Sequence, residues 1–185
     1  MSDTTTRERM ISTAMTLFRR EGYQATSWRR LVEQAGTPWG SAYHHFPGGK
    51  EQLAVAAIEL GTAVVAKTVR RAFERNETVE DAVSWWYRKA AEALAADDYR
   101  GGCPLATITL EMAHASPAIT KACQEAFAAW HVLLVELLSD VKDPEDVATA
   151  IMNNLEGALL VSRVRRSPEP LERAARHVAL VVRAP

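Results

Sequence analysis

The residues best suited to chemistry lie between Ser27 and Lys50, in the segment SWRRLVEQAGTPWGSAYHHFPGGK. Tyr43 and His45 can donate hydrogen bonds to phosphate oxygens, and Thr37 can do so where a helix is expected to begin. Lys50 combines an ammonium group with the predicted N-terminus of a long helix, and both attract phosphate. These groups indicate a phosphate-binding surface.

The patterns that support other chemistries are absent from the sequence. No carboxylate pair lies at helical spacing near a histidine, no phosphate-cradling P-loop is present, and neither cysteine has an obvious base. His44 and His45 are adjacent, so on a helix they point about 100° apart, and no acidic or cysteine partner is near them. We therefore predict no enzyme activity, no metal site and no cofactor.

Two short helices joined by a tight turn are expected to position these side chains. An apolar face with a 3.6-residue period predicts the first helix and carries Trp28, Leu31, Val32 and Ala35. Gly36 is expected to end that helix in the left-handed conformation. Thr37 and Pro38 are expected to begin the second helix as N-cap and N1. Helix, glycine-containing turn and helix form a helix-turn-helix, whose second helix lies in the major groove in its DNA-binding use.

The remainder of the chain also has helical patterns. Capping boxes of Thr5 with Glu8 and of Thr78 with Asp81 open two of the expected helices. Caps and breaks place the helices at about 5–22, 27–36, 37–46, 50–75, 78–96, 103–114, 116–138, 144–163 and 170–183. Because no strand-like alternation runs longer than a few residues, we predict an all-α protein of roughly nine helices.

Charge is unevenly distributed along the 185 residues, although the net charge is only −1. Residues 1–50 hold seven Lys and Arg against four Asp and Glu, and residues 51–185 hold fifteen against nineteen. A basic head on an acidic body favours a DNA-contacting unit attached to another function. Cys103 and Cys123 are expected to be reduced, buried thiols. No apolar run approaches the length of a membrane span, and the N-terminus lacks a signal peptide's apolar core, so we predict a cytoplasmic protein.

The segment ATSWRRLVEQAGTPWGSAYHHFPGGKEQL resembles the N-terminal DNA-binding domain of the TetR family of transcriptional repressors. The resemblance, which with Phe18 and Gly22 spans about residues 7–53, is carried by Thr26, Leu31, Ala35, Gly36, Gly40, Tyr43, His45, Phe46, Lys50 and Leu53. The chain departs from the family pattern at Thr37-Pro38, at Trp39 and in the longer loop with Gly48-Gly49. These departures affect the expected operator sequence rather than the class.

The resemblance implies which residues meet DNA. Those expected to face the groove are Trp39, Gly40, Ser41, Tyr43 and His44, while Ala42 and Phe46 pack inward. The residues expected to contact the DNA backbone are Ser27, Trp28, Thr37, Tyr43, His45 and Lys50. Two alternatives stay open, because Trp28 and Trp39 could each extend an apolar stripe of the core instead.

The C-terminal part resembles one branch of the same family through GGCPLATITLEMAHASPAI and the spacing to Phe127 and Trp130. Apolar stripes on three helices could enclose a small-molecule cavity, and a filled core is the alternative. The candidate ligand-binding residues are Trp86, Cys103, Leu105, Ile108, Met112, Phe127 and Trp130. In the family the last two long helices pair across a two-fold axis, which implies dimer contacts by Ile151, Leu155, Ala158, Leu159, Ala175 and Val178.

The predicted fold is an N-terminal three-helix helix-turn-helix domain, residues 1–50, followed by a helical ligand-binding and dimerisation domain, residues 51–185. The resemblance implies a homodimeric repressor that binds an inverted-repeat operator in double-stranded DNA and is released by a small apolar or aromatic effector. Its two recognition helices would lie about 34 Å apart. The alternatives are a helical enzyme or small-molecule carrier, and a chromosome-organising DNA binder without a ligand.

Overall fold

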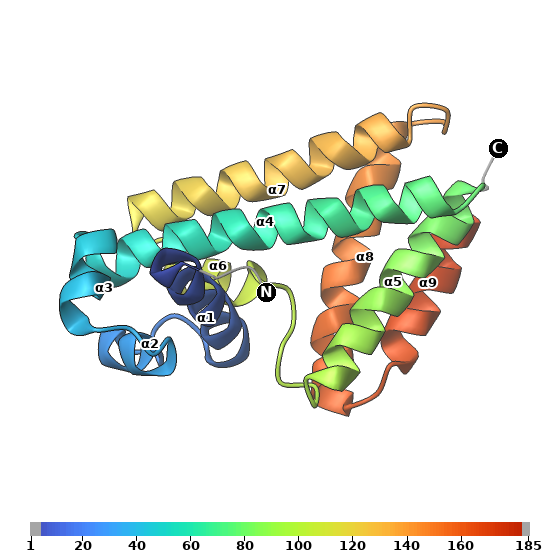
Figure 1. The fold of residues 1–185 in the computed structure, drawn as a ribbon. Coiled ribbons are helices and arrows are strands. Elements are labelled where there is room, and N and C mark those ends of the chain that lie inside the picture. The colour runs from blue at the N-terminus through green and yellow to red at the C-terminus, as the bar shows by residue number, and fades with distance from the viewer. Residues whose placement is uncertain (1–4, 183–185) are drawn as a thin grey trace. The chain divides into compact units, whose positions relative to one another are not determined.

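The computed structural model describes residues 5–182 and is all-α across them, as predicted (Figure 1). No strand occurs in that range. The helices are α1 (Thr6–Glu21), α2 (Trp28–Gln34), α3 (Trp39–His45), α4 (Gly49–Arg75), α5 (Val79–Ala96), α6 (Ala106–Met112), α7 (Pro117–Leu137), α8 (Pro144–Arg165) and α9 (Glu169–Val182). Their bounds differ from the predicted ones by a few residues.

Local capping explains where several helices begin. The Thr5 hydroxyl accepts from the Glu8 amide at 3.2 Å, and a Glu8 carboxylate oxygen accepts from the Thr5 amide at 2.8 Å. The predicted capping box at α1 is therefore confirmed. Thr78 likewise accepts from the Asp81 amide at the start of α5. Asp143 precedes α8 in a left-handed conformation and makes no side-chain cap, and Pro144 is the first residue of that helix.

The turn between α2 and α3 follows the prediction at one end only. Gly36 has a φ of +58°, the left-handed conformation expected of it after the C-cap Ala35. The start of α3 lies one residue later than expected, because Pro38 rather than Thr37 is the N-cap residue. Proline has no side-chain acceptor, and α3 begins without a side-chain cap.

The described chain divides into two compact units. One unit runs to Ala63 and includes Pro104–Ala126, and the other comprises Val64–Cys103 and the chain from Phe127 onward. Helices α4 and α7 each contribute to both units. The predicted functional boundary at residue 50 stays a prediction.

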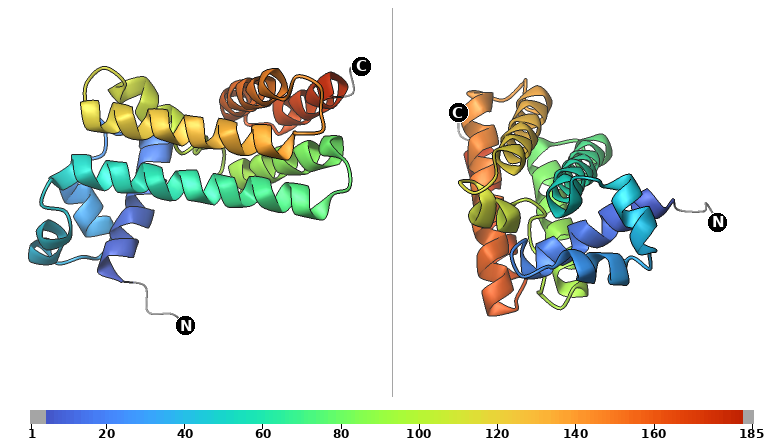
Figure 2. Two further views of the ribbon diagram at one scale, coloured as in Figure 1. Left: turned by 90° about the horizontal axis from the view of Figure 1, so that it is seen from above. Right: turned by 90° about the vertical axis from the view of Figure 1, so that its left-hand side faces the viewer.

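The first unit packs α1, α2 and α3 with the first half of α4 and with α6 (Figure 2). Its fully buried side chains come from all of these elements and include Met10, Phe18, Leu31, Ala42, Phe46, Leu53, Ile58, Leu105 and Ile108. Because Leu53, Ala54, Ala57 and Ile58 lie on one α4 face and are nearly inaccessible, α4 completes the hydrophobic core under the helix-turn-helix.

The second unit has its own core, in which α5, α8 and α9 pack against one another (Figure 1). The buried cluster centres on Tyr87 and Trp86 of α5, with Ile151 of α8 and Val178 of α9. The Tyr87 hydroxyl donates to the Ile151 carbonyl at 2.6 Å. That bond satisfies the one polar group of an otherwise buried aromatic side chain.

Helix α4 is long and apolar enough, by length and composition, to cross a membrane. The expectation that no apolar run reaches such a length is therefore wrong. The core helix of a soluble protein passes the same test, and α4 buries one face in the first unit, so the observation is weak evidence for a membrane.

Candidate nucleic-acid interface

Three aromatic side chains of the helix-turn-helix contact one another at its surface. The ring centroids of Trp28 and Tyr43 are 5.5 Å apart, and those of Trp39 and Tyr43 are 6.4 Å apart with the latter pair stacked. Tyr43 lies between the two indoles and is 52% exposed. The fold thus brings together three of the predicted DNA-binding residues, from α2 and α3, into one cluster.

The two tryptophans differ in exposure. Trp39 is 46% exposed at the first position of α3, which places it on the outer face rather than in the core. Trp28 is half-buried, and its indole nitrogen is enclosed without a hydrogen-bond partner. The open question about Trp39 is therefore answered in favour of the surface, whereas Trp28 serves both the core and the aromatic cluster.

The remaining residues of α3 divide between the two faces. Gly40 and His44 are exposed, Ser41 and His45 are half-buried, and Ala42 is buried. The His44 and His45 rings meet edge to face with centroids 5.3 Å apart. No group of three or more His, Cys, Asp or Glu residues suited to a metal ion occurs in the described residues.

Two further residues that were predicted to contact the DNA backbone, Ser27 and Thr37, differ in their exposure. Ser27 is exposed, and its hydroxyl accepts from the Arg30 amide at 3.2 Å as the N-cap of α2. The hydroxyl hydrogen of Ser27 stays available to a phosphate oxygen. Thr37 is 7% exposed, and its hydroxyl donates to the Ala35 carbonyl at 3.4 Å. A phosphate contact by Thr37 would require that hydroxyl to turn outward, so the structure does not support this assignment.

Lys50 makes internal contacts that the sequence did not suggest. Its Nζ donates to the carbonyl oxygens of Tyr23 and Thr26, both at 2.9 Å, and lies 4.0 Å from the centre of the Tyr23 ring. Burial lowers the pKa of Lys50, and the charge of Glu111 opposes that effect. Lys50 therefore holds the loop between α1 and α2, and its phosphate contact remains a prediction.

Glu111 of α6 holds the same loop from another side. Its carboxylate accepts from the Gln24 amide at 2.7 Å and lies against Gly22, whose φ is +91°. A β-carbon on Gly22 would overlap that carboxylate. A separation of 87 residues along the chain hides this contact from any local pattern. The loop that precedes the helix-turn-helix is thus fixed by α4 and α6 together.

The arginines of α2 are engaged in ion pairs on the surface. Arg29 pairs with Glu33 at 2.8 Å, and Arg30 pairs with Glu21 at 2.6 Å. Exposed pairs of this kind contribute only about 0–1 kcal/mol, so they can be exchanged for phosphate contacts at small cost. The charges of Arg29 and Arg30 are therefore available for DNA, although both are paired in the free protein.

The predicted ligand-binding residues are buried but are not all in one unit. Leu105, Ile108 and Met112 belong to the first unit, and Trp86, Cys103, Phe127 and Trp130 belong to the second. Six of the seven are under 9% exposed, and Phe127 is half-buried. Within the second unit, the Phe127 and Trp130 rings meet edge to face at 5.6 Å.

Cys103 takes part in a polar cluster that sequence analysis missed. Burial raises the pKa of Glu156, and a hydrogen bond from the Cys103 thiol opposes that rise. Burial also raises the pKa of Tyr87, and the nearby charge of Glu156 adds to the effect. Burial in the second unit thus disfavours the charged form of the Glu156 carboxyl group.

The predicted dimer residues lie in the core of the second unit. Ile151, Leu155, Ala158, Ala175 and Val178 are each under 9% exposed, and Leu159 packs partly buried against them. Their burial within a single chain leaves little surface for a partner, and their assignment to a dimer contact stays a prediction. The exposed apolar side chains of α8 and α9 are others, namely Leu160, Val161, Val164 and Leu180.

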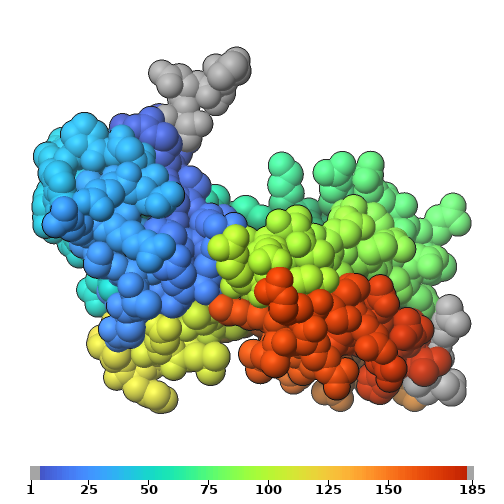
Figure 3. All heavy atoms as spheres, turned by 90° about the horizontal axis from the view of Figure 1, so that it is seen from below, coloured from blue at the N-terminus to red at the C-terminus, as the bar shows by residue number. Residues whose placement is uncertain are grey.

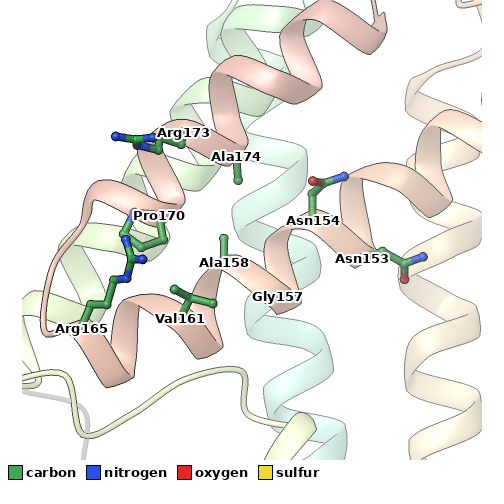
Figure 4. Close-up of a pocket in the computed structure, with 9 residues that line it drawn as sticks. All are labelled: Asn153, Asn154, Gly157, Ala158, Val161, Arg165, Pro170, Arg173 and Ala174. Carbon is green, nitrogen blue, oxygen red and sulfur yellow. The ribbon is translucent and has the colours of Figure 1, made fainter.

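A groove of about 370 Å³ lies between α8 and α9 (Figure 4). Ala158 and Ala174 point into it from the two helices, and Arg165 and Arg173 lie at its edge with Asn153 and Asn154 farther along α8. Figure 3 shows the side chains of α9, in red, at the surface of the second unit. None of the predicted ligand-binding residues lines this groove.

Two known families match most of the described chain. Residues 10–57 match the family described as bacterial regulatory proteins, tetR family, and residues 79–177 match the transcriptional regulator LmrA/YxaF-like, C-terminal domain. An HTH-type transcriptional regulator of Mycobacterium tuberculosis (strain CDC 1551 / Oshkosh) is 34% identical over 90% of this chain and 88% of its own length. The chain belongs to the TetR family of bacterial regulatory proteins.

Other TetR-family relatives match over nearly the full length. The HTH-type regulator YxaF of Bacillus subtilis is 26% identical over 96% of this chain and 95% of its own. The crystal structure of reduced Escherichia coli NemR has a TM-score of 0.85, 24% identity and coverage of 97% and 98%. A TetR regulator from Legionella pneumophila has a TM-score of 0.86, 21% identity and coverage of 99% and 100%. These structures share the fold.

The family comparison excludes one of the function classes that the sequence left open, the enzyme. TetR-family proteins are transcriptional regulators and not enzymes, so the prediction that this chain is not an enzyme is confirmed. Its helix-turn-helix is the DNA-binding part, and its C-terminal domain is of the LmrA/YxaF-like kind.

Proposed function

We propose that this TetR-family regulator is a cytoplasmic repressor, which binds an inverted-repeat operator as a homodimer and leaves it when a small apolar or aromatic effector binds. The observation that carries the proposal is the exposed face of α3, where Trp39 and Tyr43 project from a helix whose inner face is buried. A relative with 24% identity, NemR of Escherichia coli, is named as a transcriptional repressor.

The proposed DNA contacts are of two kinds, namely side-chain contacts to phosphate and a close approach of the duplex to the α3 backbone. Tyr43, His45 and Ser27 carry hydroxyl or ring N–H donors suited to phosphate oxygens, and Lys50 brings its charge to the start of α4. Gly40 exposes backbone on the outer face of α3, and no neighbouring atom lies near the place of its missing β-carbon. The duplex can therefore approach that helix closely.

The dimer contact is proposed for the outer face of α8 and α9. Leu160 and Val164 are 62% and 77% exposed, and Gly157 lies one turn before Leu160 on the same face. Exposed large aliphatic side chains beside a small residue suit the close packing of two helices. A two-fold axis there would place two recognition helices on one inverted repeat.

The effector is proposed to bind in the second unit, among Trp86, Cys103, Phe127 and Trp130. Their aromatic or sulfur-containing side chains favour an apolar or aromatic ligand. An effector can release DNA only through a higher affinity for the conformation that does not bind the operator.

Selection of random duplexes with the full-length protein, followed by fluorescence anisotropy, tests the proposal. The expected result is an inverted repeat bound by two copies of the chain, with an affinity that falls steeply as salt is added. Tyr43→Ala should weaken that binding, and Leu110→Ala, which truncates an exposed side chain of α6, should not. Binding without sequence preference would instead support a chromosome-organising protein.

A further inference from the structure

The outer face of α3 is unusual in its side chains. The helix has the sequence WGSAYHH and contains no arginine, lysine, asparagine or glutamine. Those four side chains make the specific hydrogen bonds to guanine and adenine edges in most major-groove readers. The same four types are missing from the whole stretch between Gln34 and Lys50. Base reading by this helix must therefore use other contacts.

Trp39 is the side chain best placed to make such a contact. It occupies the first position of α3, and the N-terminal residues of a recognition helix are those that meet base edges. Its indole is 46% exposed, and stacking on Tyr43 orients the ring. Tyr43 is in turn held by Trp28, with ring centroids 5.5 Å apart. The exposed apolar ring is thus oriented by contact with a second ring, which itself packs on a third.

We infer that Trp39 is a specificity-determining residue that selects thymine by packing its indole against the C5-methyl group. The thymine methyl is the one apolar group that the four bases present in the major groove, so an oriented apolar ring discriminates in its favour. Ser41 and His44 supply single hydrogen bonds beside it. This inference rests on the proposed operator binding and adds to it the base that each half-site must contain.

Deoxyuridine provides the test, because it removes the methyl group and changes nothing else on the base edge. An operator is first selected with the full-length protein, and each thymine is then replaced in turn by deoxyuridine. Loss of one buried methyl corresponds to about a fourfold rise in Kd. Replacement at the matching thymine of both half-sites should raise Kd about fifteenfold.

Variants of the protein test whether the loss of affinity for the deoxyuridine operator depends on Trp39. In Trp39→Ala the thymine and deoxyuridine operators should bind equally, whereas Leu110→Ala should discriminate between them like the original chain. Trp39→Gln serves as a second variant, since glutamine is favoured in helices and lacks the apolar ring. Thermal melting confirms that each variant is folded.

The outcomes separate the two claims. A selected operator in which deoxyuridine is tolerated at every position overturns the inference and leaves operator binding intact. The same conclusion follows if Trp39→Ala and Trp39→Gln keep the full methyl preference. Failure to select any operator overturns both claims together.

Discussion

The Glu111 carboxylate lies directly against the backbone of Gly22, in the space that a β-carbon at residue 22 would occupy. It also accepts a hydrogen bond from the Gln24 amide. Ser116, which follows α6, donates to Glu51 in the first turn of α4 at 2.6 Å. The segment around α6 is therefore tied by specific polar contacts to the residues that flank the helix-turn-helix.

This contact predicts a strong effect of substitution at Gly22. Gly22→Ala should lower the free energy of unfolding by about 1–3 kcal/mol, because alanine is strained at a φ of +91° and its β-carbon displaces Glu111. Gly36→Ala is the matched control, since φ is +58° there and no atom lies within 4 Å. Urea denaturation measures both. Equal losses in the two variants would show that Glu111 contributes nothing.

A substitution at Gly40 should change stability and DNA binding in opposite directions. Gly40→Ala should raise the free energy of unfolding by about 0.5–1 kcal/mol, because alanine is the better helix former and meets no neighbouring atom. The same substitution should weaken operator binding about tenfold or more if the backbone approaches DNA at this position. Denaturation and anisotropy on one preparation provide the check. A variant that is more stable and binds equally well would remove Gly40 from the interface.

The salt dependence of binding should reveal which role Lys50 performs. If Lys50 contacts phosphate, Lys50→Gln should reduce the slope of log K against log salt by about one for each subunit. If it acts only through the carbonyl oxygens of Tyr23 and Thr26, affinity should fall while the slope is unchanged. Arg29→Gln is a useful comparison, because that exposed side chain is paired only with Glu33 in its own helix turn.

The proposed dimer contact on the outer face of α8 can be tested by measuring the oligomeric state of the protein. Val164→Glu should weaken the dimer by about thirtyfold or more, because it places a charge within the proposed apolar contact, and the isolated chain should stay folded. Leu110→Glu introduces the same charge at a side chain that is 84% exposed on α6 and should leave the dimer intact. Sedimentation equilibrium distinguishes the two. A Val164→Glu dimer of unchanged affinity would contradict the assigned face.

The half-buried Glu156 predicts a pH dependence of stability. The pKa of Glu156 in the folded state is raised above the ordinary value of 4.5. The contribution of Glu156 to the free energy of unfolding is therefore fully present below pH 4.5 and is lost as the pH rises through the folded-state pKa. Glu156→Gln should remove this loss and make the protein relatively more stable at neutral pH. Glu136→Gln, on the exposed face of α7, is the control. Parallel pH profiles for Glu156→Gln and the original chain would contradict the assignment.

Structural features that depend only on neighbouring residues could be predicted from the sequence. The Thr5–Glu8 capping box and the left-handed Gly36 follow from a few consecutive side chains, and both are confirmed. The exposed position of Trp39 was left open, because an aromatic residue at helical spacing fits a core stripe and a surface equally well. Only the packing of α1 against α2 and α3 shows which side of the helix is covered.

Contacts between distant segments could not be predicted in this way. Nothing near Lys50 in the sequence indicates that its ammonium would meet the carbonyl oxygens of Tyr23 and Thr26. In α8 the apolar residues cover more than one face, and periodicity does not say which face meets the chain's own core. The resemblance to the family assigned Ile151 and Leu155 to a partner, whereas the structure shows both packed in a cluster with α5 and α9.

The burial of Leu53, Ala54, Ala57 and Ile58 determines how the DNA-binding head can be isolated. A fragment that stops at Lys50 would lack these four side chains, which belong to the buried core of the first unit. Such a peptide should aggregate or remain unfolded. Any domain-swap experiment that grafts this head onto another effector module must therefore carry the first half of α4 with it.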